Sequence, residues 1–300
     1  MRDLVLAGGG HSHVAVLKSF GERPAFGARL TLISRDRLTA YSGMLPGFLA
    51  GHYGQAESHI DLAPLSRFAG ARFLQANVTG VDAARRLIRC EGLEPVRFDL
   101  LSLDIGAAPG LAAIAGAELA LPIKPIDGFL RGWAAIERRV LERGGSFRLL
   151  IVGGGAGGVE LCLSLRYRLH RLLAERGGDA GRLSFAIVTD TAEPLPQHAP
   201  AVRARIARLL AERGIPLHAG FTVEAFDAGT AHCRPPHDIA FDAAILATGA
   251  AAPSWLGQTG LALDGRGFVR VDAALRSPSH AFVFAAGDIA AIDGHALPKS

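Results

Sequence analysis

Short apolar runs that end in glycine dominate the hydrophobic pattern of the chain. Residues 4–7 lead into Gly8-Gly9-Gly10, and residues 149–152 lead into Gly153-Gly154-Gly155. Both runs are continuous rather than alternating, so each predicts a strand of a parallel sheet that is covered on both faces. After the second run, the leucines of residues 161–173 recur at helical spacing, which predicts a long helix ending near Gly177-Gly178.

These runs belong to an internal repeat of about 145 residues. Six landmarks recur in order at offsets of 143 to 145: Gly8 and Gly153, Gly70 and Gly214, Asp82 and Asp227, Cys90 and Cys233, Phe98 and Phe241, and Gly106 and Gly249. Each copy predicts a second strand (30–34 and 185–189), weaker β segments (72–75 and 217–225) and a closing strand (99–106 and 242–249). Strands alternating with helices predict an α/β fold, and the glycine turn after the first strand of each copy predicts two Rossmann-like dinucleotide-binding domains.

The composition of the chain excludes several classes of protein. The 300 residues suit about two domains, and 49% hydrophobic residues exclude a disordered chain. Three cysteines exclude a disulfide scaffold. The 32 basic and 28 acidic residues are scattered, so no nucleic-acid partner is predicted. The apolar runs are too short for a membrane-spanning helix or a signal peptide, which predicts a cytoplasmic protein that is at most peripheral at the inner face of a membrane.

The glycine turns carry the candidate chemistry. Gly153, Gly155 and Gly158 follow a strand and open a helix, as in the turn that holds a dinucleotide pyrophosphate at a helix N-terminus. The first turn has Gly8 and Gly10, but His13 stands in the third position, where it is expected to hold helix and strand slightly further apart. No metal site is predicted, because His11 and His13 have no further ligands at suitable spacing.

The end of the second strand of each copy is expected to contact a ribose. In the second copy this place holds Asp190, whose carboxylate would bind the ribose hydroxyls and repel a 2′-phosphate, favouring NADH over NADPH. A turn residue is the alternative role of Asp190. In the first copy the place holds Ser34, with Arg35 beside it.

Together these motifs resemble the FAD-dependent pyridine nucleotide-disulfide oxidoreductases, and the resemblance covers essentially the whole chain. It implies that the first turn binds FAD and the second binds NAD(P)H. Residues 281–288 are similar to the second FAD motif of that family, and residues 41–47 are similar to the segment that borders the flavin in type II NADH dehydrogenases. Residues 8–14 and 41–51 look most similar to the oxidoreductase domain fused ahead of selenide, water dikinase.

The resemblance implies a set of site residues and two domains. Glu160 and Pro46 are expected near the reacting rings, although Glu160 also fits a solvated helix surface. The expected cofactor contacts are Gly8, Gly10, His13, Ser34, Arg35, Val78, Gly106 and Asp288 for FAD, and Gly153, Gly155, Gly158, Asp190 and Gly249 for NAD(P)H. The expected domains are an FAD-binding domain (1–110 and 253–300) and an NAD(P)H-binding domain with its linker (111–252).

The sequence departs from the family pattern in two ways. Cys90, Cys162 and Cys233 form no redox pair and are expected to be buried packing residues. The chain ends twelve residues after Asp288, so a C-terminally truncated two-domain fold is expected.

The resemblance implies transfer of hydride from NADH to FAD and of electrons onward to a small-molecule acceptor such as a quinone. Two alternatives stay open: a sulfide:quinone-type oxidoreductase, and a truncated module that binds dinucleotides without turnover. A dehydrogenase with one Rossmann domain would leave the repeat unexplained.

Overall fold

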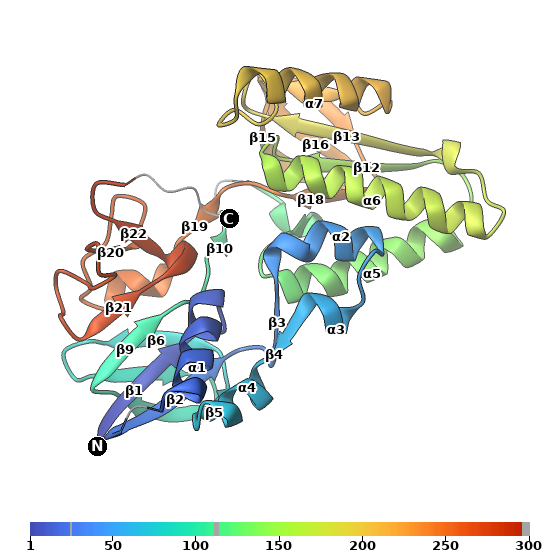
Figure 1. The fold of residues 1–300 in the computed structure, drawn as a ribbon. Helices are drawn as coiled ribbons and strands as arrows, with labels where there is room; N and C mark the ends of the chain where they lie inside the picture. Colours follow the sequence, from blue (N-terminus) through green and yellow to red (C-terminus); the bar gives the residue numbers. More distant parts are fainter. Residues whose placement is uncertain (25, 111–113, 296–300) are drawn as a thin grey trace. The chain divides into compact units, whose positions relative to one another are not determined.

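A computed structural model describes residues 1–24, 26–110 and 114–295. The chain forms two compact units (Figure 1). The first unit combines Met1–Ser42, Ala56–Ala108 and Ala250–Ser300, and the second combines Gly43–Gln55 and Pro109–Gly249. Two ends of the predicted domains, 111 and 300, lie outside the described residues.

A five-stranded sheet organises the first unit. Its strand order is β21 (Val283–Ala285), β9 (Leu100–Leu103), β1 (Arg2–Ala7), β2 (Ala28–Ser34) and β5 (Arg72–Gln75). Every pairing in it is parallel. Helices α1 (His11–Glu22) and α4 (Leu62–Phe68) pack with it through the buried leucines 17, 30, 32 and 62. The alternate side chains of these strands, among them Val5, Ile33 and Leu101, are buried in a second cluster with Val81 and Ile88, so both faces of the sheet are covered, as the pattern predicts.

Smaller elements complete the first unit. These are the antiparallel pair β3 (Leu38–Ala40) and β4 (His59–Asp61), the antiparallel sheet β6 (Val78–Asp82), β7 (Leu87–Cys90) and β8 (Leu93–Arg97), and the parallel pair β20 (Val269–Val271) and β22 (Ala290–Ile292). Short helices are α3 (Gln55–Ser58), which begins at the last residue assigned to the second unit, η4 (Ser254–Gln258) and η5 (Gly287–Ile289). Strand β10 (Ala108–Pro109) pairs with β19 (Ala250–Ala251) where the chain passes between the units.

The second unit repeats this plan. Its sheet runs β11 (Leu121–Pro122), β18 (Ala243–Leu246), β12 (Phe147–Val152), β13 (Leu183–Thr189) and β14 (Leu217–Ala219), again all parallel. An antiparallel sheet of β15 (Thr222–Asp227), β16 (Thr230–Arg234) and β17 (His237–Ala240) matches β6–β8 of the first unit. The helices are η1 (Ser42–Met44, at the unit boundary), α2 (Leu45–Ala50), η2 (Ala117–Leu119), α5 (Ile126–Glu142), α6 (Ala156–Glu175), η3 (Ala180–Arg182) and α7 (Pro200–Glu212). The structure therefore confirms the repeat and the predicted fold class.

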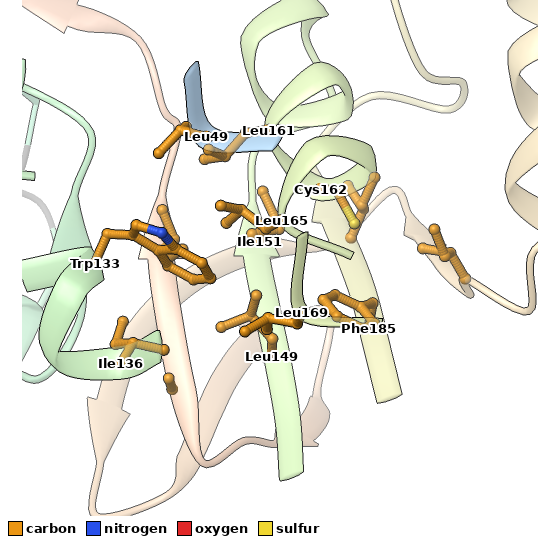
Figure 2. Packing of buried hydrophobic residues seen from close by; sticks show 14 of the residues in the cluster. Leu49, Trp133, Ile136, Leu149, Ile151, Leu161, Cys162, Leu165, Leu169 and Phe185 are labelled. Atoms are coloured by element: carbon orange, nitrogen blue, oxygen red, sulfur yellow. The ribbon is translucent and has the colours of Figure 1, made fainter. Parts of the chain in front are cut away.

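The core of the second unit explains why residues 43–55 belong to it. Figure 2 shows Leu49 of α2 beside Leu161 of α6, with Trp133 of α5 near Leu165 and Ile151. Leu45 and Leu49 are buried in this cluster, where they cover the apolar stripe of α6. The domain boundaries predicted from the sequence keep residues 43–55 in the first domain, whereas burial of these two leucines groups the segment with the second unit.

Candidate functional site

Each parallel sheet has one place where the strand order reverses, and a glycine turn lies there. In the first unit the chain proceeds outward from β1 through β2 to β5 and then returns to β9 on the other side of β1. In the second unit the same reversal separates β12 from β18. Ligands of open α/β sheets bind in this crevice, outside the carboxyl ends of the strands.

The first turn needs glycine for two reasons. Gly8 has φ +102°, and a Cβ there would lie 2.1 Å from the carbonyl oxygen of Asp104. Gly10 donates its N–H to the same carbonyl at 3.3 Å and precedes α1. A Cβ on Gly10 would lie 2.2 Å from the Asp104 carboxylate. The turn is therefore fitted closely against the end of β9.

Asp104 is the residue of this site that sequence reasoning missed. Its side chain is 5% exposed, and Oδ2 accepts the Ser12 N–H at 3.0 Å. Burial raises the pKa of this carboxyl to about 6, against the opposing effects of the His13 and Ser12 N–H groups, the Ser12 hydroxyl and the charge of His11. The available signal was the repeat itself, since the offset of 143 aligns Asp104 with Ala247.

His13 occupies the place of the third glycine and is 1% exposed. Its Nδ1 lies 2.7 Å from the Gly8 carbonyl oxygen, and its Nε2 lies 2.8 Å from the Ser102 hydroxyl. Burial lowers its pKa to about 4, so the ring is neutral at pH 7. In the second copy a Cβ on Gly158 would lie 2.0 Å from the Gly153 carbonyl oxygen. The first turn instead makes room for a side chain and uses it to link α1, the turn and β9.

Strand β2 ends at Ser34 and is followed by Arg35, so neither of the two residues predicted to contact the ribose is an acid. The buried Ser34 hydroxyl donates to the Asp36 carbonyl oxygen at 2.9 Å. The exposed Arg35 guanidinium pairs with the Asp36 carboxylate at 2.6 Å. A ribose contact by either residue stays a prediction.

Three other predicted FAD contacts lie at loop or strand ends of the first unit. Val78 begins β6, and Gly106 follows β9 with φ +69°. Asp288 is half-buried on η5, directly after Gly287. A Cβ on Gly287 would lie 2.5 Å from Oδ1 of Asp104, which brings the start of η5 to the same crevice as Gly8 and Gly10.

The second turn has the same backbone plan as the first, but no described side chain lies against its last glycine before the helix, Gly155. Gly153 has φ +125°, and its Cβ would lie 2.5 Å from the Ala247 carbonyl oxygen. A Cβ on Gly155, which precedes α6, would meet no described atom within 4 Å. The N-terminus of α6 therefore has open space beside Gly155 and presents the positive end of a 20-residue helix.

The remaining second-unit predictions flank this turn. Asp190 is exposed directly after β13, where a ribose-binding acid is expected. Gly249 follows β18 and is the last residue of the unit before the chain returns to the first. Glu160 is exposed on α6, and Pro46 is half-buried in the first turn of α2. Roles for Glu160 and Pro46 near a flavin stay predictions.

The three cysteines are buried and free, as predicted. Burial raises the pKa of each thiol, that of Cys162 to about 12. None of them is a thiolate nucleophile at neutral pH. Among residues 1–24, 26–110 and 114–295, no group of three or more His, Cys, Asp or Glu side chains is arranged to hold a metal ion. No helix in this described part is long and apolar enough to cross a membrane.

Comparison with known proteins decides the family. The profile of the pyridine nucleotide-disulphide oxidoreductases matches residues 2–299. The chain belongs to this family. It is accordingly an FAD- and NAD(P)H-dependent oxidoreductase, and the resemblance found in its sequence is confirmed.

Relatives of this oxidoreductase differ in their named activities. A nitric oxide reductase FlRd-NAD(+) reductase of Citrobacter koseri is 28% identical over 308 residues, which cover 99% of this chain and 74% of that protein. The solved structure of NDH2 from Plasmodium falciparum in complex with NADH has a TM-score of 0.82 at 17% identity, over 97% of this chain and 65% of that one. The sulfide:quinone oxidoreductase of Aquifex aeolicus has a TM-score of 0.75 at 18% identity, over 97% and 69%. This chain thus spans about two thirds of the length of these solved proteins.

The two turns of this oxidoreductase fit a dinucleotide to different degrees. The second is open at Gly155, so its backbone suits a pyrophosphate as it stands. The first has the required backbone, but the Asp104 carboxylate already accepts an N–H from the start of α1.

Proposed function

We propose that this chain is an NADH-dependent flavin oxidoreductase that passes electrons to an acceptor such as a quinone. In this proposal the domain of residues 1–110 and 253–300 holds FAD, and the domain of residues 111–252 holds NADH. The observation that carries it is the pair of glycine turns at the reversal points of two parallel sheets, with an exposed acid, Asp190, after the second strand of one.

The residues of the second unit have clear roles in this proposal. The backbone N–H groups that follow Gly155 bind the NADH pyrophosphate, and Asp190 accepts hydrogen bonds from the adenosine ribose hydroxyls. The Asp190 carboxylate would repel a 2′-phosphate, which favours NADH over NADPH. Bound FAD supplies a ring that accepts hydride and returns electrons to a second acceptor. Glu160 and Pro46 then help to shape the space near the reacting rings.

Two classes of molecule are candidates for the electron acceptor. A quinone is supported by the similarity in fold to NDH2 and to a sulfide:quinone oxidoreductase. The relative named as an FlRd-NAD(+) reductase favours a redox protein instead. Sulfide as the electron source receives no support from the cysteines, whose buried thiols have raised pKa values.

The test is the visible absorption spectrum of the purified chain, supplemented with FAD, before and after anaerobic addition of NADH. We expect flavin bands that bleach with NADH and return when a short-chain quinone is added. Bands that do not bleach would contradict NADH as donor. Bleached bands that return with a redox protein but not with quinone would reassign the acceptor. If no FAD binds, the chain is a dinucleotide-binding module without turnover.

A further inference from the structure

The carboxylate of Asp104 lies where the first turn would receive an anion. Its Oδ2 accepts the Ser12 N–H from the first turn of α1 at 3.0 Å. A Cβ on Gly10 would lie 2.2 Å from both carboxylate oxygens, and a Cβ on Gly287 would lie 2.5 Å from Oδ1. Two glycines from distant parts of the chain thus leave room for this one side chain.

The second unit provides an internal comparison. Ala7 pairs with Leu103 and Val152 pairs with Leu246, so Asp104 and Ala247 occupy the same register position, one residue beyond each pair. The space beside Gly155 is open, whereas the equivalent space beside Gly10 holds the Asp104 carboxylate. The second unit has only the methyl group of Ala247 at the position of Asp104. The difference between the two turns therefore comes from one side chain as well as from His13.

We propose that the first turn takes up its dinucleotide together with one proton, which is held on the carboxylate of Asp104. This inference rests on the proposed assignment of FAD to the first unit. A pyrophosphate at the start of α1 would compete with the carboxylate for the same N–H groups, and its negative charge would repel the carboxylate. One proton from solvent binds to Oδ1 or Oδ2 and removes one negative charge, and the neutral carboxyl can then donate a hydrogen bond to a phosphate oxygen.

The surroundings of Asp104 allow its carboxylate to take up a proton near neutral pH. Burial has already raised its pKa to about 6, and a bound anion would raise it further. His11 at the start of α1 acts in the opposite direction when charged. His13 is buried and neutral, and Asp288 follows Gly287 on η5. The Asp104 carboxyl lies so close to Gly10 and Gly287 that neither could carry a Cβ, and it would therefore lie close to a dinucleotide bound at the first turn.

The experiment is calorimetric titration of the flavin-free full chain with FAD at about pH 6, 7 and 8, in two buffers of different ionisation enthalpy. For the wild type we expect uptake of about one proton per FAD at pH 8 and a Kd that rises up to about tenfold per pH unit. Asp104→Asn should bind FAD with a Kd independent of pH and take up no proton. NADH binding to the second turn, where Ala247 stands, serves as the control and should take up no proton.

The outcomes separate this inference from the proposed function. FAD binding to the wild type without proton uptake, at a Kd that does not change with pH, would overturn the role of Asp104 and leave the FAD site intact. Failure of FAD to bind at every pH would overturn the FAD assignment and this inference with it. The proton count is measured on the wild type, so it decides the matter even if Asp104→Asn does not fold.

Discussion

His13 and Ser102 join helix α1 to strand β9 through a hydrogen bond of 2.8 Å. The Gly8 carbonyl oxygen only accepts, so Nδ1 of His13 carries the proton and Nε2 accepts from the Ser102 hydroxyl. A neutral ring with one fixed tautomer is thus built into the first turn. This arrangement explains how a histidine replaces the third glycine of the motif.

The first prediction concerns acid stability. The pKa of His13 is lowered from 6.5 to about 4, so its contribution to stability is complete above pH 6.5 and is lost as the pH falls through about 4. Between pH 7 and pH 5 this group should reduce the unfolding free energy by about 2 kcal/mol. Urea unfolding of the flavin-free wild type and of His13→Asn, which does not titrate, should show the smaller decrease in the variant. Equal decreases would contradict the neutral, buried ring.

The second prediction separates two glycines of the second turn. Gly158→Ala should lower the unfolding free energy by about 1–3 kcal/mol, because its Cβ would lie 2.0 Å from the Gly153 carbonyl oxygen. Gly155→Ala should leave stability within about 0.5 kcal/mol, since its Cβ has open space, yet weaken NADH binding at least about tenfold. Thermal unfolding and NADH titration measure both effects. Gly144→Ala, also in open space but before the start of β12, whose other end leads into the turn, should change neither.

A third prediction tests the choice of nicotinamide cofactor. Asp190→Ser should raise the Kd for NADH about tenfold and lower that for NADPH, because the carboxylate that binds the ribose hydroxyls and repels a 2′-phosphate is removed. Titrations with both cofactors measure the ratio. Glu212→Ala removes an exposed acid of α7 in the same unit and should leave that ratio unchanged. An unchanged ratio in Asp190→Ser would indicate a turn residue.

The fourth prediction concerns the thiols. Because burial raises the pKa of Cys90, Cys162 and Cys233, the native chain should react with a thiol-specific disulfide reagent far more slowly than the urea-unfolded chain. Bleaching of the flavin by NADH should be unaffected by this treatment. Rapid reaction of one thiol with loss of bleaching would support a cysteine-dependent oxidoreductase.

The fifth prediction addresses Glu160. Glu160→Gln should slow flavin reduction at saturating NADH by about tenfold, or about 1.4 kcal/mol of activation free energy, if the carboxylate acts near the reacting rings. Glu175→Gln, at the other end of α6, is the matched control and should have no effect. Equal rates for all three proteins would place Glu160 among the solvated residues of the helix surface.

Much of the fold could be predicted because it depends on local patterns. The strand at residues 72–75 and the long helix through residues 161–173 are found where the sequence places them. The grouping of residues 43–55 could not be predicted, since it depends on burial of Leu45 and Leu49 against a helix more than 100 residues away. Asp104 was missed for a similar reason. Its position opposite Gly8 follows from the register of β9 on β1, which no short motif encodes.

The path of the chain between the two units determines whether either unit can be produced separately. It crosses between the units four times, after residues 42, 55, 108 and 249. A fragment of residues 109–249 would therefore lack α2 and expose to water the apolar residues of α6 that Leu45 and Leu49 cover. Neither unit can be excised, exchanged or inherited as one continuous gene segment, so a change to either cofactor site must be made by substitution within the whole chain.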